Sequence, residues 1–513
     1  MAVTRALTAA VGVIVACACA EAQPARVGSK SFTESYLIAE IIARLVEQAG
    51  EAKADRRFGL GGTGMIYRAL ETGEIDVYPE YTGTISRAIL NDPALDTLEA
   101  IRAALARRGL VVSAPLGFEN TYALAVREDV GERLGLRTIS DLGRHSMLGG
   151  PSGSPQTPPT RSLGPTPPAR SLGPTPPARS LRAAFTSGFL ERDDGWPGLR
   201  RHYGGLVLAD VRAIEHALAY PALASGQVDV IDAFSTDGRL TQGRFRLLQD
   251  DRKFFPSYAA VLLARRSFVE RAPRTWAAIE RRLAGRIDTA EMTRLNARID
   301  LEGVSIERTA AEFLGTTVAR EDGRHRLLRE VLALTLDHLG LVGVSLAVAI
   351  LAGIPLGIVA ARYRLLGQLE LISVGVVQTI PSLALLCFMI PLFGIGKTPA
   401  LVALSLYALL PIVRGAYTGL ITLDRQLLEI AGVLGLSAWQ RLVKIELPLA
   451  SVSIMAGIKT AAVVTVGTAT LAAFIGGGGY GDLIVRGLAL NDVGTILAGA
   501  IPAALMALVF HAA

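Results

Sequence analysis

The side chains that most often carry out chemistry in proteins are few and scattered in this chain of 513 residues. The three cysteines are Cys17, Cys19 and Cys387, all in apolar stretches, so the polar part between them has no thiol for a disulfide or a metal. The six histidines form no His-x-x-x-His pair, and a lone histidine is more often a surface or core residue than a ligand. We therefore expect no metal, no cofactor and no catalysis.

Two short stretches offer binding chemistry instead. "VYPEYTGT" places Tyr78 and Tyr81 near the end of an expected strand, either as half-buried packing residues or as rings presented to a ligand. In "GSKSFTES" Ser31 and Glu34 have the spacing of a capping box, which would leave helix amides free to form an anion site with Lys30. The residues alone leave both stretches open between a structural and a binding role.

Strands and helices alternate from about residue 26 to 310, and such alternation predicts a largely parallel sheet covered by helices. Ligands of these sheets bind at the carboxyl ends of strands and at helix N-termini. The alternation is interrupted at 152–181 by a proline-rich insert in which the nine residues Ser162–Arg170 recur as Ser171–Arg179. Proline at this density favours a solvated polyproline-like loop, and an expanded repeat is favoured over a docking motif.

Apolar residues are concentrated after about residue 338, which explains a mean hydropathy of +0.39 for the whole chain. We expect a linker at 311–337 and a membrane domain at 338–513 with five transmembrane helices. Basic residues follow the first and third spans, so both loops should be cytoplasmic and the N-terminal domain should lie outside. The net charge of +6 does not point to nucleic acid. The spans are expected near 338–360, 370–393, 399–421, 450–475 and 493–511.

The first 22 residues resemble an export signal, with Arg5 ahead of an apolar run and small residues after it. The same stretch also fits a lipoprotein signal with Cys17 as the lipid-bearing residue, and both versions remain open. Either signal delivers the α/β domain to the outer side of the cytoplasmic membrane, in agreement with the loop charges.

The loop after the third span, "EIAGVLGLSAWQRLVKIELP", resembles the coupling loop of permease subunits in ATP-binding-cassette importers. The resemblance implies a helix, a glycine turn and a second helix that bind a separate cytoplasmic ATPase. The ATPase must be separate because "GIGKT" at 394–398 lacks the first glycine of a phosphate-binding loop. An interfacial helix without a partner is the plain alternative. The residues in register are Glu429, Ala431, Gly435, Ile445, Leu447 and Pro448.

Six stretches of the polar half, among them "FENTYALAV", "DVIDAFSTDGRL" and "DDRKFFPSYAAVLL", resemble substrate-binding proteins for glycine betaine, choline, carnitine and related osmoprotectants. The resemblance implies a two-lobed periplasmic-binding-protein fold at 26–310 that closes on a quaternary-ammonium solute. It also implies a box of aromatic rings around the trimethylammonium head, met by cation–π attraction, and donors for a carboxylate. By position, the box is Tyr81, Tyr122, Phe234 and Tyr258, and the donors are Lys30, Thr84 and Arg192.

The sequence thus predicts an importer component of the cytoplasmic membrane, a binding domain fused to its permease, which pairs with a second copy and with ATPases. Three alternatives stay open. The solute is another trimethylammonium compound such as ergothioneine, or the chain is a membrane-tethered sensor. A degraded gene product is the third, because the sequence ends at Ala513 directly after the fifth span.

Overall fold

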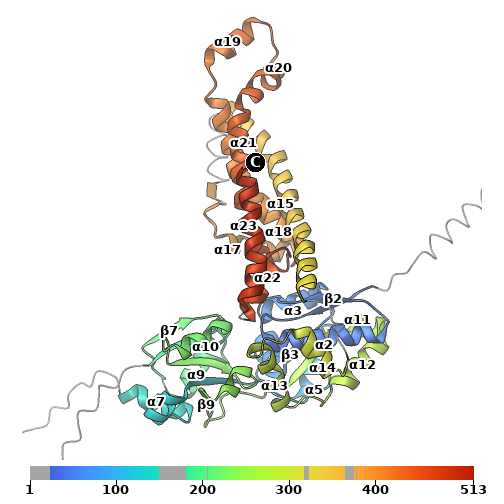
Figure 1. Ribbon diagram of the computed structural model, residues 1–513, viewed down its shortest axis with the longest axis vertical. Coiled ribbons are helices and arrows are strands. Elements are labelled where there is room, and N and C mark those ends of the chain that lie inside the picture. The colour runs from blue at the N-terminus through green and yellow to red at the C-terminus, as the bar shows by residue number, and fades with distance from the viewer. Residues whose placement is uncertain are drawn as a thin grey trace, which may run out of the picture.

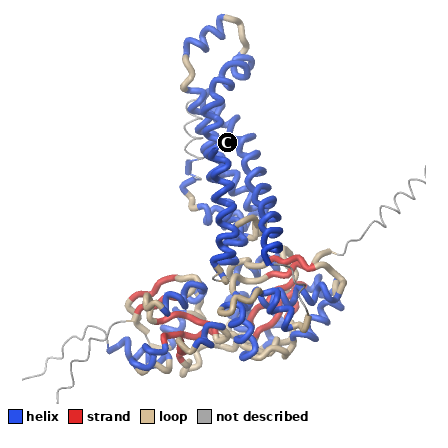
Figure 2. The backbone as a smooth tube through the Cα atoms, in the orientation of Figure 1, coloured by secondary structure: helices blue, strands red, loops and turns tan. Residues whose placement is uncertain are grey.

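The computed structural model describes residues 23–148, 181–204, 206–316, 323–363, 375–376, 378–490 and 492–512. The predicted signal at 1–22, including Cys17, and all but the last residue of the insert 152–181 lie outside these residues. Figure 1 shows two α/β lobes side by side at one end of a long helical domain. Figure 2 shows the strands gathered in the two lobes. The predicted fold class, a two-lobed α/β domain followed by a helical domain, is confirmed.

The first lobe contains a five-stranded sheet in the order β2-β1-β3-β10-β4. Its longest helix, α2, is apolar on successive turns and buries Ile38, Ile41 and Leu45 against the sheet before it ends at Gly50 in the left-handed region. The strands are β1 (Ala25–Gly28), β2 (Ala54–Arg57), β3 (Val77–Tyr81), β4 (Leu110–Val112) and β10 (Ala260–Arg265). The helices are α2 (Thr33–Ala49), α3 (Thr63–Thr72), α4 (Thr82–Thr84), η1 (Ile85–Ile89), α5 (Leu98–Ala106), α11 (Arg266–Arg271), α12 (Pro273–Leu283), α13 (Thr289–Asp300) and α14 (Ile306–Phe313).

The second lobe contains a five-stranded sheet in the order β7-β6-β8-β5-β9. The chain enters this lobe between β4 and β5 and returns to the first lobe between β9 and β10. The strands are β5 (Tyr122–Arg127), β6 (Arg182–Phe185), β7 (Asp210–Ala213), β8 (Val230–Phe234) and β9 (Phe245–Leu248). The helices are α6 (Glu128–Leu134), α7 (Ile139–Leu148), α8 (Ser187–Glu191), α9 (Trp196–His202), α10 (His216–Ala224) and η2 (Gly238–Gln242).

Both sheets are mixed, which corrects the prediction of a largely parallel sheet. In the first lobe β10 runs antiparallel to β3 and β4, and in the second β5 runs antiparallel to β8 and β9. These are the strands with which the chain enters a lobe after crossing from the other. The alternation of strands and helices shows which segments cross over a sheet, but it does not show the direction in which a crossing segment arrives.

Among its described residues, the helical domain contains four helical segments long and apolar enough to span a membrane: Leu327–Arg362, Lys397–Ile421, Ala438–Ile475 and Val493–Ala512. The predicted second span at 370–393 is described only in part, with a 12-residue helix over Ser382–Phe393. The first helix begins at Gly323, inside the predicted linker. The elements are α15 (Gly323–Arg362), α17 (Ser382–Phe393), α18 (Lys397–Ile421), α19 (Arg425–Val433), α20 (Ala438–Arg441), η3 (Leu442–Glu446), α21 (Leu447–Ala469), η4 (Thr470–Ile475), α22 (Gly481–Ala489) and α23 (Val493–Ala512).

The first lobe packs directly on the helical domain. Leu60, in the loop before α3, lies against Gly476, where an added Cβ would be 3.1 Å from the Leu60 Cδ2 atom. Leu60 shares one buried apolar cluster with Leu341 of α15 and Ile475 of η4. Helix α10 of the second lobe contacts α22. The binding domain is therefore seated on the helical domain, chiefly by its first lobe.

The predicted coupling loop has the predicted form and lies at the end of the helical domain opposite the two lobes (Figure 1). Helix α19 is followed by Gly435, whose φ of 75° lies in the left-handed region that favours glycine. Ser437 and Gln440 then form a capping box at the start of α20. Trp439 is 71% exposed and Val433 is 88% exposed. A helix, a glycine turn and a helix thus present apolar side chains at the far end.

Candidate ligand-binding site

Three of the four predicted box residues meet where the two lobes face each other. Tyr122 begins β5 and lies opposite Phe234, the last residue of β8, in the antiparallel register. Their ring centroids are 5.2 Å apart. The ring of Tyr258, from the first lobe, lies 5.8 Å from that of Tyr122 at an interplanar angle of 88°. The strand register and the return of the chain into the first lobe therefore bring these rings together.

Three further phenylalanines join this cluster and were not predicted. Phe32, just before α2, stacks on Phe234 from the other lobe, with a centroid distance of 5.9 Å. The rings of Phe189 and Phe255 lie 5.1 Å and 6.3 Å from that of Tyr122. All three stand in stretches that resemble the osmoprotectant-binding proteins. Their ring type and their position in those stretches are the signal that could have identified them.

Tyr81 lies at the end of β3, in the same buried apolar cluster of the first lobe as Tyr258. Its hydroxyl donates to Glu34, which also accepts hydrogen bonds from the side-chain amides of Asn120 at 2.9 Å and Asn296 at 3.1 Å. Burial raises the pKa of Glu34 above its usual range, against the effect of these donors. Tyr81 is thus held by its hydroxyl, with its ring below the Lys30 ammonium, 5.6 Å from the ring centroid.

The predicted capping box is wrong. The N-cap of α2 is Phe32, without a side-chain cap. The Ser31 hydroxyl instead donates to the carbonyl of Gly59 at 3.1 Å and accepts from the amide of Gly61 at 3.2 Å. Glu34 turns to Tyr81 and the two asparagines. The spacing of Ser31 and Glu34 was that of a capping box, but partners far along the chain bind both side chains more favourably.

Lys30 is not an unpaired cation. Its ammonium donates to the Glu80 carboxylate at 2.6 Å, and both side chains are buried. Burial lowers the pKa of Lys30, and the charge and hydrogen bond of Glu80 oppose that effect. Glu80 also accepts from the amide of Tyr81 at 3.0 Å and from the hydroxyl of Tyr78 at 3.3 Å. Tyr78 is fully buried, so of the two roles that the sequence left open for it, the structure favours packing.

Arg192 is also paired. Its guanidinium binds Asp194 with two nitrogens, and the Nε–Oδ1 distance is 2.7 Å. The same guanidinium lies 5.7 Å from the ring centroid of Tyr122. The hydroxyl of Tyr258 donates to the other Asp194 oxygen at 2.6 Å. Burial disfavours the charge of Asp194, but Arg192 outweighs burial and lowers the pKa of this carboxyl group.

Thr84 lies in the buried single turn α4 that follows Tyr81. One residue earlier, an added Cβ on Gly83 would lie 2.6 Å from the ring of Tyr258, so only glycine fits there. The Thr-Gly-Thr step therefore lets β3 and its turn approach the ring cluster.

His216, at the start of α10, is a charged group of the site that was not predicted. Its ring lies 4.9 Å from that of Phe234, and Nε2 lies 3.2 Å from an Asp237 oxygen. Burial acts to lower the pKa of His216, but Asp237 outweighs it and the pKa is raised to about 9. Ring faces and edges grouped in this way suit a cation with methyl groups. The carboxylates Glu80 and Asp194 beside them are already paired with Lys30 and Arg192.

Comparisons with known proteins cover both halves of the chain. Residues 23–316 match the family of the substrate binding domain of ABC-type glycine betaine transport systems, and residues 353–513 match that of the binding-protein-dependent transport system inner membrane component. A glycine-betaine-binding protein of Pseudomonas aeruginosa is 32% identical over 326 residues, 62% of this chain and 96% of that protein.

On the membrane side, a glycine betaine/carnitine/choline transport system permease protein of Bacillus subtilis is 42% identical over 180 residues, 35% of this chain and 83% of that protein. Among solved structures, a glycine betaine/carnitine/choline ABC transporter is 27% identical, with a TM-score of 0.44 over 57% of this chain and 97% of that one.

Proposed function

Because the chain belongs to the ABC-type glycine betaine transport family and joins a substrate-binding domain to an inner-membrane permease domain, we propose that it imports one quaternary-ammonium or betaine-type osmoprotectant. The binding domain captures the solute outside the cytoplasmic membrane. The permease domain then carries it inward. The chain itself has no catalytic role in this account, and a separate ATPase supplies the energy.

The meeting of Tyr122, Phe234 and Tyr258 between the lobes carries the proposal of a quaternary-ammonium head. A trimethylammonium group cannot donate a hydrogen bond, so ring faces and nearby carboxylates are the partners that stabilise it. Two rings of the proposed box already lie close to cations of the protein: Lys30 near Tyr81, and Arg192 near Tyr122. These ring faces therefore have the geometry for cation–π contact.

The carboxylate end of a betaine would bind near Lys30, Thr84 and Arg192. Since Lys30 is paired with Glu80 and Arg192 with Asp194, a bound carboxylate would compete with an existing ion pair. A cation without a carboxylate, such as choline, leaves both pairs intact. We therefore propose that choline-type cations bind at least as tightly as betaines.

The segment from Glu429 to Pro448 is the proposed docking site for the ATPase. Its support is the exposure of Val433 at the end of α19 and of Trp439 in α20, at the end opposite the binding domain. Two chains would pair around one path, each with its own ATPase. An ATPase bound at this end would lie on the cytoplasmic side of the membrane, opposite the binding domain.

Uptake into proteoliposomes tests this function. The chain is reconstituted with an ABC ATPase that copurifies with it, and radiolabelled choline and glycine betaine are supplied on the binding-domain side. ATP inside the vesicles should drive accumulation, and Gly435→Val should abolish it together with copurification. ATP-independent equilibration, or uptake unaffected by Gly435→Val, would contradict the proposal.

A further inference from the structure

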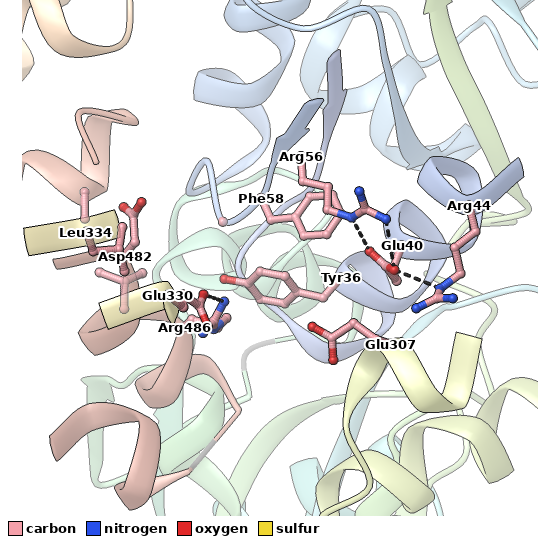
Figure 3. Close-up of a pocket in the computed structure, with 13 residues that line it drawn as sticks. Tyr36, Glu40, Arg44, Arg56, Phe58, Glu307, Glu330, Leu334, Asp482 and Arg486 are labelled. Carbon is pink, nitrogen blue, oxygen red and sulfur yellow. Dashed lines mark hydrogen bonds and ion pairs between the residues drawn. The ribbon is translucent and has the colours of Figure 1, made fainter. Parts of the chain in front are cut away.

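A cavity lies at the junction between the first lobe and the helical domain, apart from the ring cluster (Figure 3). Its volume is about 420 Å³. One wall comes from α2, β2, the residues just after β2 and Glu307 of α14, and the other comes from α15, η4 and α22. Cavities that bind small molecules have volumes from roughly 300 Å³ upward. The space is therefore large enough for a compact organic solute.

Most of the charges at this cavity are paired. Glu40 of α2 binds both Arg44, at 2.9 Å, and Arg56, at 2.7 Å. On the opposite wall, Arg486 of α22 binds Glu330 of α15 at 2.7 Å. Figure 3 shows Tyr36 between these two groups. Glu47, just outside the lining, also binds Arg56 at 2.7 Å, so the positive charge of each arginine at the cavity is met by a carboxylate.

Asp482 differs from these groups. Within the part of the chain that the structure describes, its carboxylate makes no hydrogen bond and no ion pair. Its side chain is exposed toward the cavity, on a helix outside the four membrane-spanning segments. Desolvation raises the pKa of Asp482 to about 6, with Arg486 opposing this effect and Asp337 and Glu330 adding to it. At neutral pH Asp482 is thus largely ionised, and Arg486, the opposite charge that acts on it most, is already paired with Glu330.

Apart from Glu307 of α14, the remaining lining is apolar. Phe58, Leu334 and Val485 provide side chains that pack against methyl groups. Phe58 is supported by Tyr36 in an edge-to-face contact with a centroid distance of 6.3 Å. A carboxylate without an ion-pair partner of its own, together with an aromatic ring and aliphatic walls, is the chemistry that stabilises a quaternary ammonium ion and not an anion.

We propose that this cavity is a second, transient site for the cationic head of the transported solute. The solute occupies it after release from the proposed site at the ring cluster between the lobes, here called the cleft, and before entry into the permease. The proposal rests on the proposed function. Asp482 neutralises the cation, and the apolar walls contact its methyl groups. Because both walls are needed, the site exists only where the binding domain is seated on the helical domain.

Labelling of a cysteine at the cavity tests the proposal. In the full chain in nanodiscs, with Cys17, Cys19 and Cys387 replaced by serine, Val485→Cys places one thiol in the wall. Its rate of reaction is measured with a trimethylammonium-bearing methanethiosulfonate and with the sulfonate-bearing analogue. Leu301→Cys, on the exposed surface of the first lobe, is the reference thiol.

Relative to the reference thiol, the thiol introduced by Val485→Cys should react at least tenfold faster with the cationic reagent than with the anionic one. Choline should slow its reaction with the cationic reagent at least fivefold. Asp482→Asn should remove both effects. Choline that gives no protection, or protection that survives Asp482→Asn, would overturn the proposal.

A separate variant distinguishes the cavity from the cleft. Tyr122→Ala weakens the cleft site, and protection of the thiol at 485 by choline should persist in it. If Tyr122→Ala abolishes that protection, closure of the cleft and not occupancy of the cavity protects the thiol, and the second site is excluded. Failure of choline to bind the cleft is measured independently by calorimetry, so the two proposals fail separately.

Discussion

The hydroxyl of Tyr258 in the first lobe donates to an Asp194 oxygen in the second lobe at 2.6 Å, so one hydrogen bond to a charged group joins the two lobes beside the ring cluster. The Asp194 carboxylate is at the same time held by Arg192. A ring of the proposed box therefore also stabilises this arrangement of the two lobes.

Replacing Tyr258 by Phe should keep the ring and remove the bond between the lobes. Hydrogen bonds to charged groups contribute about 1.5–3 kcal/mol, so solute affinity should fall by about one to two orders of magnitude. Isothermal titration of the full chain measures this change. Tyr203→Phe is the control, because its hydroxyl bonds to Asp250 within the second lobe alone. Equal solute affinities for Tyr258→Phe and the parent would show that this hydrogen bond does not contribute to solute binding.

Asp194→Asn should change which solute is preferred. It releases the Arg192 guanidinium, which can then pair with a ligand carboxylate, so the ratio of glycine betaine affinity to choline affinity should rise about tenfold. Competition between the two solutes for the full chain measures this ratio. The matched control is Asp193→Asn, because Asp193 is an exposed neighbour paired with Arg201. A ratio that does not change would show that Arg192 takes no part at the carboxylate end.

Leu60→Asp should separate binding from transport. The substitution puts a charge into the apolar contact with Gly476 and so weakens the seating of the first lobe on the helical domain, while the cleft keeps all its residues. Uptake should fall at least tenfold, and solute affinity should stay within twofold of the parent. Leu301→Asp, at an exposed position of the same lobe, controls for the added charge. Full uptake by Leu60→Asp would argue against this contact.

Alkaline pH should weaken the site through His216. Its pKa is raised from 6.5 to about 9, so the stability contributed by the protonated ring is fully present below about pH 6.5 and is lost as the pH rises through 9. The thermal midpoint of the parent should therefore fall between pH 6.5 and 9.5 by more than that of His216→Gln. The exposed His202 provides the control His202→Gln. Identical pH profiles for the parent and His216→Gln would contradict the assignment.

Much of the site could be predicted from sequence because Tyr122, Phe234 and Tyr258 belong to stretches that resemble known binding proteins. The helix, glycine turn and helix around Gly435 were predicted for the same reason. The role of Glu34 was missed because its partner Tyr81 lies 47 residues away and Asn296 lies 262 residues away. Spacing along the chain reports only local partners, so the capping box was predicted in place of these bonds.

The pairing of Lys30 with Glu80 was missed for a related reason. The two residues stand at the ends of neighbouring strands, 50 residues apart, and only the sheet order brings them together. Because the sequence does not show that Glu80 is its partner, Lys30 was predicted to be an unpaired cation at an anion site. The mixed sheets were missed because the direction of β5 and β10 depends on how the chain crosses between the lobes.

The most direct test of the central claim is a calorimetric titration of the full chain with choline, glycine betaine, carnitine, proline betaine and ergothioneine. We predict saturable binding of at least one of these trimethylammonium or related quaternary cations. Tyr122→Ala and Tyr81→Ala should each weaken it by about 2 kcal/mol or more, the value of a desolvated cation–π contact. No binding of any of the five solutes, or parental affinity in both variants, would contradict the claim that these rings hold a quaternary-ammonium head.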